Sequence, residues 1–249
     1  MIRRLLLLFV IALVVHQADA QNMRRVLKRR TAEASIWGAA GYYGNPHWAV
    51  GSTIHYLHGV GRKKQWFSFG CGLRASVFQT KKREYETSSN SLYQLNQGGA
   101  DSLYFPKVQT NTLNAYFAIK IRIKRGVDAV FTTDLGGINF GDSKEAFFHS
   151  YETQPVPPGV KYKTEPYAFN LNQLNYGSYG SLYSEAYGSF KLNDVLLWRL
   201  GIQYFRNEYK VDRLIPLNGK RFYQNHWMAM TALSFDLRWK KNYQQSRLL

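Results

Sequence analysis

Residues 110–124, TNTLNAYFAIKIRIK, alternate between apolar and polar side chains almost without interruption. Leu113, Phe117 and Ile121 fall on one face of this segment, and Asn114 and Lys120 fall on the other. A period of two is typical of a β-strand with one apolar and one polar face, because successive side chains of a strand point to opposite sides. The segment therefore predicts a β-strand and not a helix.

The last long segment of the chain has the same period. Its apolar face carries Trp227, Ala229, Leu233, Phe235, Leu237 and Trp239, and its polar face carries Ser234, Asp236 and Arg238. The two tryptophans lie at opposite ends of the apolar face, which is where the aromatic girdles of a membrane barrel meet the two interfaces of the bilayer.

Further strands of the same kind are predicted along the chain. They cover residues 33–43, 47–58, 65–79, 127–139, 180–192 and 195–209. Together with the two segments above they make about eight, and most exceed the usual five or six residues of strands in soluble sheets. Such lengths suit tilted strands that cross a membrane. We therefore expect an all-β fold, a transmembrane antiparallel up-and-down β-barrel of about eight strands.

The predicted connections alternate between two classes. Residues 59–64, 124–126 and 193–194 form short turns, whereas residues 80–109, 140–179 and 210–224 form long polar loops. In outer-membrane barrels the short turns face the periplasm and the long loops face outward. The connection at residues 44–46 is short but fits the same order, which predicts that both termini lie in the periplasm.

The N-terminus has the features of a secretory signal peptide. Arg3 and Arg4 precede an apolar run over residues 5–15, and Ala18 and Ala20 form a small-x-small cleavage pattern. No later stretch approaches the roughly 18 apolar residues that a membrane-spanning helix needs. We expect four regions: a signal peptide (1–20), a basic periplasmic segment (21–32), the barrel (33–240) and a tail (241–249).

The composition limits the classes of partner. The net charge of +17 and the pI of about 9.9 would suggest a nucleic-acid ligand in a cytosolic protein, but the signal peptide argues against it. In an exported barrel, Lys and Arg can instead meet outer-membrane lipids and the phosphates of lipopolysaccharide. The only cysteine, Cys71, excludes an intrachain disulfide and is expected on a lipid-facing position.

The polar faces of the strands predict a charged barrel interior. Its expected members are Arg74, Lys120, Arg122, Asp128, Asp134, Glu185, Arg199, Asp236 and Arg238, with Glu33 and Lys191 on the same faces. An eight-stranded barrel is only wide enough for its own side chains, so these groups should pair with one another. The alternative is a narrow anion-preferring channel that uses Arg74, Arg122 and Arg199.

The sequence offers little for catalysis or cofactor binding. A lipid-modifying enzyme would need an outer-rim histidine, such as His47 or His226, beside a serine or an acid. His55 and His58 are three residues apart and so lie on opposite faces of a strand, which argues against a shared metal site. We predict a chain that is not an enzyme and that has no cofactor and no metal ligand.

Two regions are predicted to bind an envelope protein partner. The basic segment contributes Arg24, Arg25, Lys28, Arg29 and Arg30, and the outer loops contribute Tyr151, Tyr162 and Tyr167. Prolines in residues 150–166, SYETQPVPPGVKYKTEP, predict a semi-rigid external arm that is neither strand nor helix.

The signal peptide, the alternating strands and the Trp-flanked final strand together resemble the small outer-membrane β-barrel proteins of Bacteroidota-like bacteria. The resemblance implies an outer-membrane location in a Gram-negative cell and a structural role or an accessory role in secretion or envelope assembly. The competing functions are the anion channel and the lipid-modifying enzyme, and the competing fold is a soluble periplasmic β-sandwich.

Overall fold

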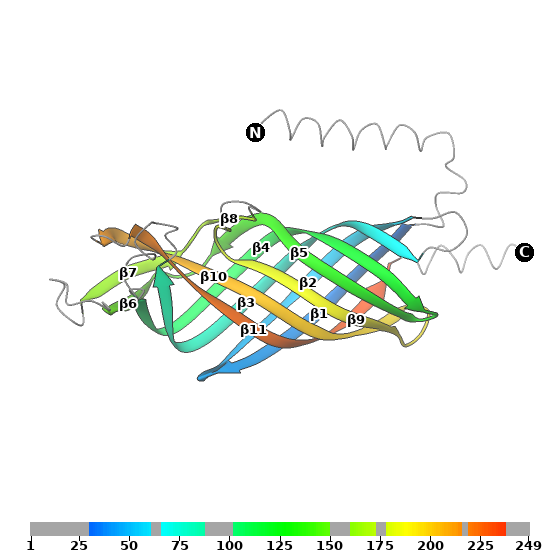
Figure 1. Ribbon diagram of the computed structural model, residues 1–249, viewed down its shortest axis with the longest axis horizontal. Coiled ribbons are helices and arrows are strands. Elements are labelled where there is room, and N and C mark those ends of the chain that lie inside the picture. Colours follow the sequence, from blue (N-terminus) through cyan, green and yellow to red (C-terminus); the bar gives the residue numbers. More distant parts are fainter. Residues whose placement is uncertain are drawn as a thin grey trace, which may run out of the picture.

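The computed structural model describes residues 30–60, 66–87, 102–149, 160–172, 178–215 and 219–237, and it is an antiparallel β-barrel (Figure 1). Its strands are β1 (Arg30–Tyr43), β2 (Asn45–Val60), β3 (Phe67–Thr87), β4 (Ser102–Lys124), β5 (Val127–Phe140), β6 (Lys144–His149), β7 (Lys161–Pro166), β8 (Phe169–Leu171), β9 (Leu182–Lys191), β10 (Leu196–Ile215) and β11 (Gly219–Asp236). None of the described residues belongs to a helix long and apolar enough to cross a membrane.

Eight of these strands close into a ring. Each pairs with its neighbour in the order β1, β2, β3, β4, β5, β9, β10 and β11, and β11 pairs back onto β1 from Glu33↔Asp236 to Ala40↔Ala229. The predicted up-and-down barrel of eight strands is therefore confirmed. A closed ring satisfies the backbone groups of every strand, because it has no free edge.

A second, smaller ring continues the barrel beyond the β1–β2 hairpin. There β3 pairs directly with β11, β6 pairs with β4, and β7 joins β6 to β10, so that six strands surround the axis. We call this six-stranded section the cap. Figure 1 shows β6 and β7 at one end of the barrel, and we call the other end, where β1 begins and β11 ends, the turn end.

The strands of the cap show that the prediction of long polar loops was wrong for much of their length. Residues 80–87 and 102–109 belong to β3 and β4, and residues 210–215 and 219–224 belong to β10 and β11. Residues 161–166, predicted as part of an irregular arm, form β7. Polar loops and polar strand ends look alike in sequence. Of the prolines of the arm, Pro166 lies in a described strand, as the last residue of β7.

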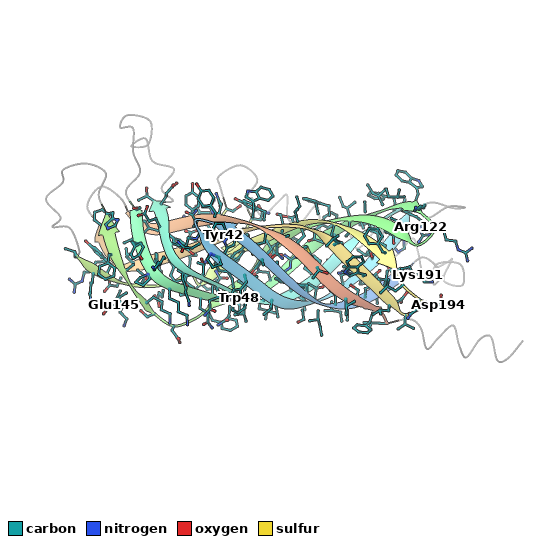
Figure 2. All side chains as sticks on the ribbon, turned by 90° about the horizontal axis from the view of Figure 1, so that it is seen from below. Tyr42, Trp48, Arg122, Glu145, Lys191 and Asp194 are labelled. Atoms are coloured by element: carbon teal, nitrogen blue, oxygen red, sulfur yellow. The ribbon has the colours of Figure 1, made fainter. Side chains whose placement is uncertain are left out.

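The outer surface of the eight-stranded ring is apolar, as the sequence predicted. Aliphatic side chains such as Ile36, Ile54, Leu73 and Leu233 point outward between two bands of aromatic residues. The band toward the cap contains Tyr42, Tyr43, Trp48, Phe140, Phe169 and Trp227, and the band at the turn end contains Trp66, Phe69, Phe190 and Trp198. Figure 2 shows Tyr42 and Trp48 between Glu145 in the cap and Asp194 at the turn end.

The predicted facing of individual residues also holds within the described chain. Cys71 is exposed on the outer surface. His55 is buried inside and His58 lies on the outer face, as their spacing predicted. Trp239, the expected second girdle residue of the last strand, lies outside the described residues, and Trp198 and Phe190 hold the corresponding band instead.

Candidate functional site

The first feature of the interior is a buried arginine with two acidic partners. Arg74 of β3 is fully buried, and its Nη1 contacts the Oδ1 atom of Asp134 on β5. Its Nη2 lies 2.8 Å from Oε2 of Glu185 on β9. The three strands bring these groups together because each side chain occupies an inward position of its own strand. Two carboxylates on one guanidinium fix the positions of all three strands relative to the axis.

Neutral side chains complete this cluster. Nδ2 of Asn114 donates to Oδ2 of Asp134 at 2.6 Å, and the backbone amide of Tyr183 donates to the same oxygen at 2.9 Å. Nε2 of Gln203 donates to Glu185 at 2.8 Å. Buried carboxylates need such donors, since an unmatched charge in a low-dielectric interior is strongly destabilising.

A second cluster lies nearer the turn end and is centred on Glu33. Its carboxylate lies 2.7 Å from Nζ of Lys120, 2.7 Å from Nη2 of Arg199 and 3.4 Å from Nε2 of His55. Lys120 also lies 3.2 Å from Asp128. His55 in turn contacts the Tyr116 hydroxyl at 3.0 Å, and the absence of a side chain at Gly72 leaves space for that ring.

The structure thus brings most of the predicted interior residues into two paired clusters. Arg122 is different: its side chain is about half exposed at 52% and lies 3.5 Å from Asp128 at the rim. Lys191 is exposed, Asp236 is half-buried, and Arg238 lies outside the described residues. Of the three arginines assigned to an anion path, Arg74 and Arg199 are each neutralised by buried carboxylates, so they do not line an open cationic passage.

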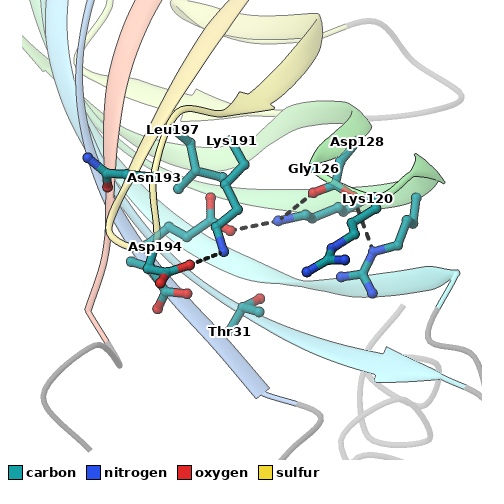
Figure 3. A pocket seen from close by; sticks show the side chains of 12 residues that line it. Thr31, Lys120, Gly126, Asp128, Lys191, Asn193, Asp194 and Leu197 are labelled. Carbon is teal, nitrogen blue, oxygen red and sulfur yellow. Dashed lines mark hydrogen bonds and ion pairs between the residues drawn. The ribbon is translucent and has the colours of Figure 1, made fainter. Parts of the chain in front are cut away.

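A cavity of about 430 Å³ opens at the turn end, and we call it the mouth (Figure 3). It is lined by Thr31, Glu33, Lys120, Arg122, Arg125, Gly126, Asp128, Lys191, Asn193, Asp194, Leu197 and Asp236. Four cationic and four acidic residues are among those that line it, and Lys191 donates to Asp194 at 2.7 Å. That hydrogen bond and the charge of Lys191 hold the pKa of the Asp194 carboxyl below its usual range. The mouth is therefore balanced in charge and not a basic funnel.

The inside of the cap is closed by aromatic residues. Phe105 is fully buried, with its ring centroid 4.8 Å from that of Tyr85 and 5.0 Å from that of Tyr209. Leu103, Ala146, Phe148, Val211 and Phe222 are buried in the same apolar cluster. The Tyr85 hydroxyl accepts from Asn207 at 2.9 Å and the Tyr209 hydroxyl donates to the Gln109 carbonyl at 2.8 Å. We call this cluster the aromatic plug.

An arginine that the sequence analysis did not single out joins the cap to the barrel. Arg83 of β3 donates from Nη1 to the Tyr43 carbonyl, and from Nη2 to the Asn45 carbonyl at 2.8 Å and to His47 Nδ1 at 3.0 Å. It therefore holds the tip of the β1–β2 hairpin at the point where the ring narrows. In the sequence, Arg83 lies within a predicted loop, and its role in holding the hairpin could not be predicted from that position.

These contacts assign the hydrogen-bonding roles of the two ring nitrogens of His47. Because Arg83 donates to Nδ1 of His47, that nitrogen is an acceptor, and Nε2 of His47 donates to the Trp227 carbonyl at 3.1 Å. Gly41 leaves room for this contact. The His226 ring lies 5.0 Å from that of His47 and 4.6 Å from Phe78. The two rings are therefore neighbours, but both are buried within the barrel, and each ring nitrogen of His47 has a hydrogen-bond partner.

Replacing Arg83 with alanine is expected to lower the free energy of unfolding by about 1 to 3 kcal/mol, because buried and partly buried acceptors of a charged donor are left unmatched. The loss should be measured by urea unfolding in lipid vesicles. Arg213→Ala is the matched control, since that side chain is 84% exposed. Equal unfolding midpoints for the two variants would contradict the role assigned to Arg83.

The predicted partner-binding residues fall in several places. Arg24, Arg25, Lys28, Arg29 and Tyr151 lie outside the described residues, and Arg30 begins β1. Tyr162 packs on Phe148 in the cap, and Tyr167 lies under the Arg221 guanidinium at 5.0 Å. Partner binding by these residues stays a prediction. Within the described chain, no group of three or more His, Cys, Asp or Glu side chains is placed to hold a metal ion.

Comparison with known proteins gives matches of fold shape alone. No protein-family model and no curated protein matches the sequence. Similar solved structures include Neisserial surface protein A, with 7% identity, a TM-score of 0.32 and coverage of 84% of this chain and 96% of that one. They also include the attachment invasion locus protein Ail of Yersinia pestis, with 14% identity, a TM-score of 0.30 and coverage of 83% and 99%. A major outer membrane protein of Thermus thermophilus has 12% identity, a TM-score of 0.31 and coverage of 82% and 98%.

Proposed function

We propose that this chain is a sealed, non-enzymatic β-barrel of a Gram-negative outer membrane, with periplasmic termini and a structural or partner-binding role. The observation that carries the proposal is the packing of the described interior side chains in both parts of the barrel. Paired charges occupy the half toward the turn end, and the aromatic plug occupies the cap. A barrel whose interior is filled by its own side chains is a structural element and not a channel.

The outer surface supports the membrane assignment. Trp227 and Leu237 bound the apolar face of the last strand segment, and the ten residue steps from one to the other, at about 3.3 Å each and inclined by roughly 40°, span about 25 Å. That height matches the apolar band of outer-membrane barrels. A soluble sandwich would instead turn its aliphatic faces toward each other, whereas here Ile36, Ile54 and Leu233 are about half exposed or more.

The lengths of the connections at the two ends support a direction of insertion. The described connections at the turn end, such as residues 125–126 between β4 and β5, are short, whereas the cap extends well beyond the apolar band. Short turns face the periplasm in this class of barrel, and the longer side faces outward. The cap then projects from the cell surface as a closed six-stranded platform, which is the part best placed to contact a partner.

The wild-type protein, expressed with its signal peptide, is expected in the outer-membrane fraction and should migrate faster on a gel before boiling than after it. In planar bilayers the purified protein should give no discrete conductance steps, because Arg74 and Arg199 are ion-paired inside and the aromatic plug closes the cap. Reproducible anion-selective steps would contradict the sealed interior. A soluble periplasmic protein with no mobility shift would overturn the membrane assignment.

A further inference from the structure

The barrel wall changes its facing at one level, on two neighbouring strands. In β3, Thr80 and Arg83 point inward while Lys81 and Lys82 both point outward. In β4, Phe105 and Val108 point inward while Pro106 and Lys107 both point outward. Each strand thus places two consecutive residues outside, where strict alternation would allow one. At this level the eight-stranded ring gives way to the six-stranded cap.

The outward turn of Lys82 is held in place by the β1–β2 hairpin. Lys82 has a left-handed backbone with φ of 50°, which is uncommon for a residue with a side chain. Nδ2 of Asn45 donates to the Lys82 carbonyl at 3.1 Å, and the adjacent Arg83 is bound to the hairpin tip on the inside. These contacts with the hairpin therefore keep both lysines exposed at the junction between the ring and the cap.

The result is a cluster of three positive charges, which we call the lysine patch: Lys81, Lys82 and Lys107. Lys81 and Lys107 occupy directly opposite positions in the β3–β4 ladder, an arrangement that is destabilising for like charges. None of the three forms an ion pair with a carboxylate of the described residues.

Three other lysines of the cap each form an ion pair. Lys144 lies 3.4 Å from Asp142, Lys161 lies 3.0 Å from Glu145, and Lys210 lies 3.0 Å from Glu165. The three lysines of the lysine patch thus differ from Lys144, Lys161 and Lys210, because they lie together without a carboxylate partner among the described residues.

The lysine patch lies at the level of the outer aromatic band. Thr80 and Gln79, next to it on β3, pair with His47 and Trp48 of β2. Tyr42 and Tyr43, at the tip of the same hairpin, are 77% and 75% exposed. Tyrosine and tryptophan in such a band sit at the headgroup level of a bilayer, so the three amino groups lie where lipid phosphates are found.

We propose that the lysine patch binds the phosphate groups of anionic lipid headgroups in the outer leaflet, an inference that rests on the membrane assignment made above. A phosphate between Lys81 and Lys107 would replace their repulsion with two charge-assisted hydrogen bonds. Lys82 would add a third donor from the same side. The junction of ring and cap then anchors the barrel at a fixed height in the membrane.

The test compares two triple variants in phosphatidylcholine vesicles that contain a small amount of spin-labelled phosphatidic acid. The wild type should hold phosphatidic acid in preference to spin-labelled phosphatidylcholine. K81Q/K82Q/K107Q should weaken that preference by about five-fold or more, since one lysine near an anionic surface contributes about that factor. K144Q/K161Q/K210Q removes the same charge from paired positions and should keep the wild-type preference.

Equal preference in both triple variants would overturn the lysine patch as the binding site. Complete displacement of phosphatidic acid by inorganic phosphate would overturn the lipid assignment in favour of a free phosphate ion. Gel mobility before and after boiling tests membrane insertion separately from lipid binding. A wild type that fails to insert overturns the membrane assignment and this inference together, whereas an inserted wild type with no preference for phosphatidic acid overturns this inference alone.

Discussion

Arg74→Met is expected to lower the free energy of unfolding by about 3 to 5 kcal/mol, the usual range when one partner of a buried ion pair is removed. Methionine keeps much of the side-chain volume but leaves Asp134 and Glu185 as unmatched buried carboxylates. The loss should appear as a lower urea midpoint in vesicles and as a lower temperature for the change in gel mobility.

Two further variants show whether the unmatched charge is the cause. Arg122→Met, at a half-exposed rim position, should cost at most about 1 kcal/mol. The triple variant R74M/D134N/E185Q removes all three charges of the cluster and should recover more than half of the loss, because neutral replacement of a buried ionic cluster is well tolerated. A loss in R74M no larger than in R122M would show that the interior cluster does not stabilise the barrel.

Phe105→Ala is the second change with a large expected effect, again about 3 to 5 kcal/mol, because it opens a cavity in a fully packed apolar cluster. The rings of Tyr85 and Tyr209 lose their common neighbour, and the hydrogen bonds that position their hydroxyls should loosen. The measurement is urea unfolding in vesicles, combined with limited proteolysis of the cap from outside the vesicle.

Phe169→Ala is the matched control, since Phe169 is 70% exposed on the outer surface and leaves no cavity when it is shortened. We expect less than half the effect of Phe105→Ala and no new cleavage in the cap. If Phe105→Ala left both stability and protease resistance unchanged, the cap would not be the packed platform described here, and the sealed-barrel proposal would lose its support at the outer end.

The two large effects concern different halves of one interior. The half toward the turn end is held by charges that must be matched, and the cap is held by apolar packing. Arg83 lies between them, where the β1–β2 hairpin ends and β3 meets β11. An interior filled by paired charges in one half and by apolar packing in the other favours a structural or partner-binding role over transport.

The eight-stranded ring could be predicted from the sequence because its signal is local and repeated. In a membrane barrel every outward position faces an apolar solvent and every inward position faces polar neighbours, so each strand carries the alternation by itself. The facing of Leu113 against Asn114, and of Leu233 against Ser234, followed directly from this period. The number of strands then followed from counting such segments.

The cap could not be predicted in the same way. Its strands lie outside the apolar band, so their outer faces are as polar as loops, and the period of two is broken at Lys81–Lys82 and at Pro106–Lys107. Where the alternation of apolar and polar residues breaks, the sequence predicts a loop. Only the pairing of β3 with β11, and of β6 and β7 with β4 and β10, shows that these segments are strands.

Within the eight-stranded ring, the sequence by itself determined most of the residues that enter the interior, because facing there follows from the position of a residue along its own strand. Which of them meet was decided by the tertiary structure. Arg74 and Asp134 are 60 residues apart, and Arg199 and Glu33 are 166 residues apart. Such pairs depend on the register of every strand between them and on the closure of the ring, which are non-local properties that no single segment of the chain encodes.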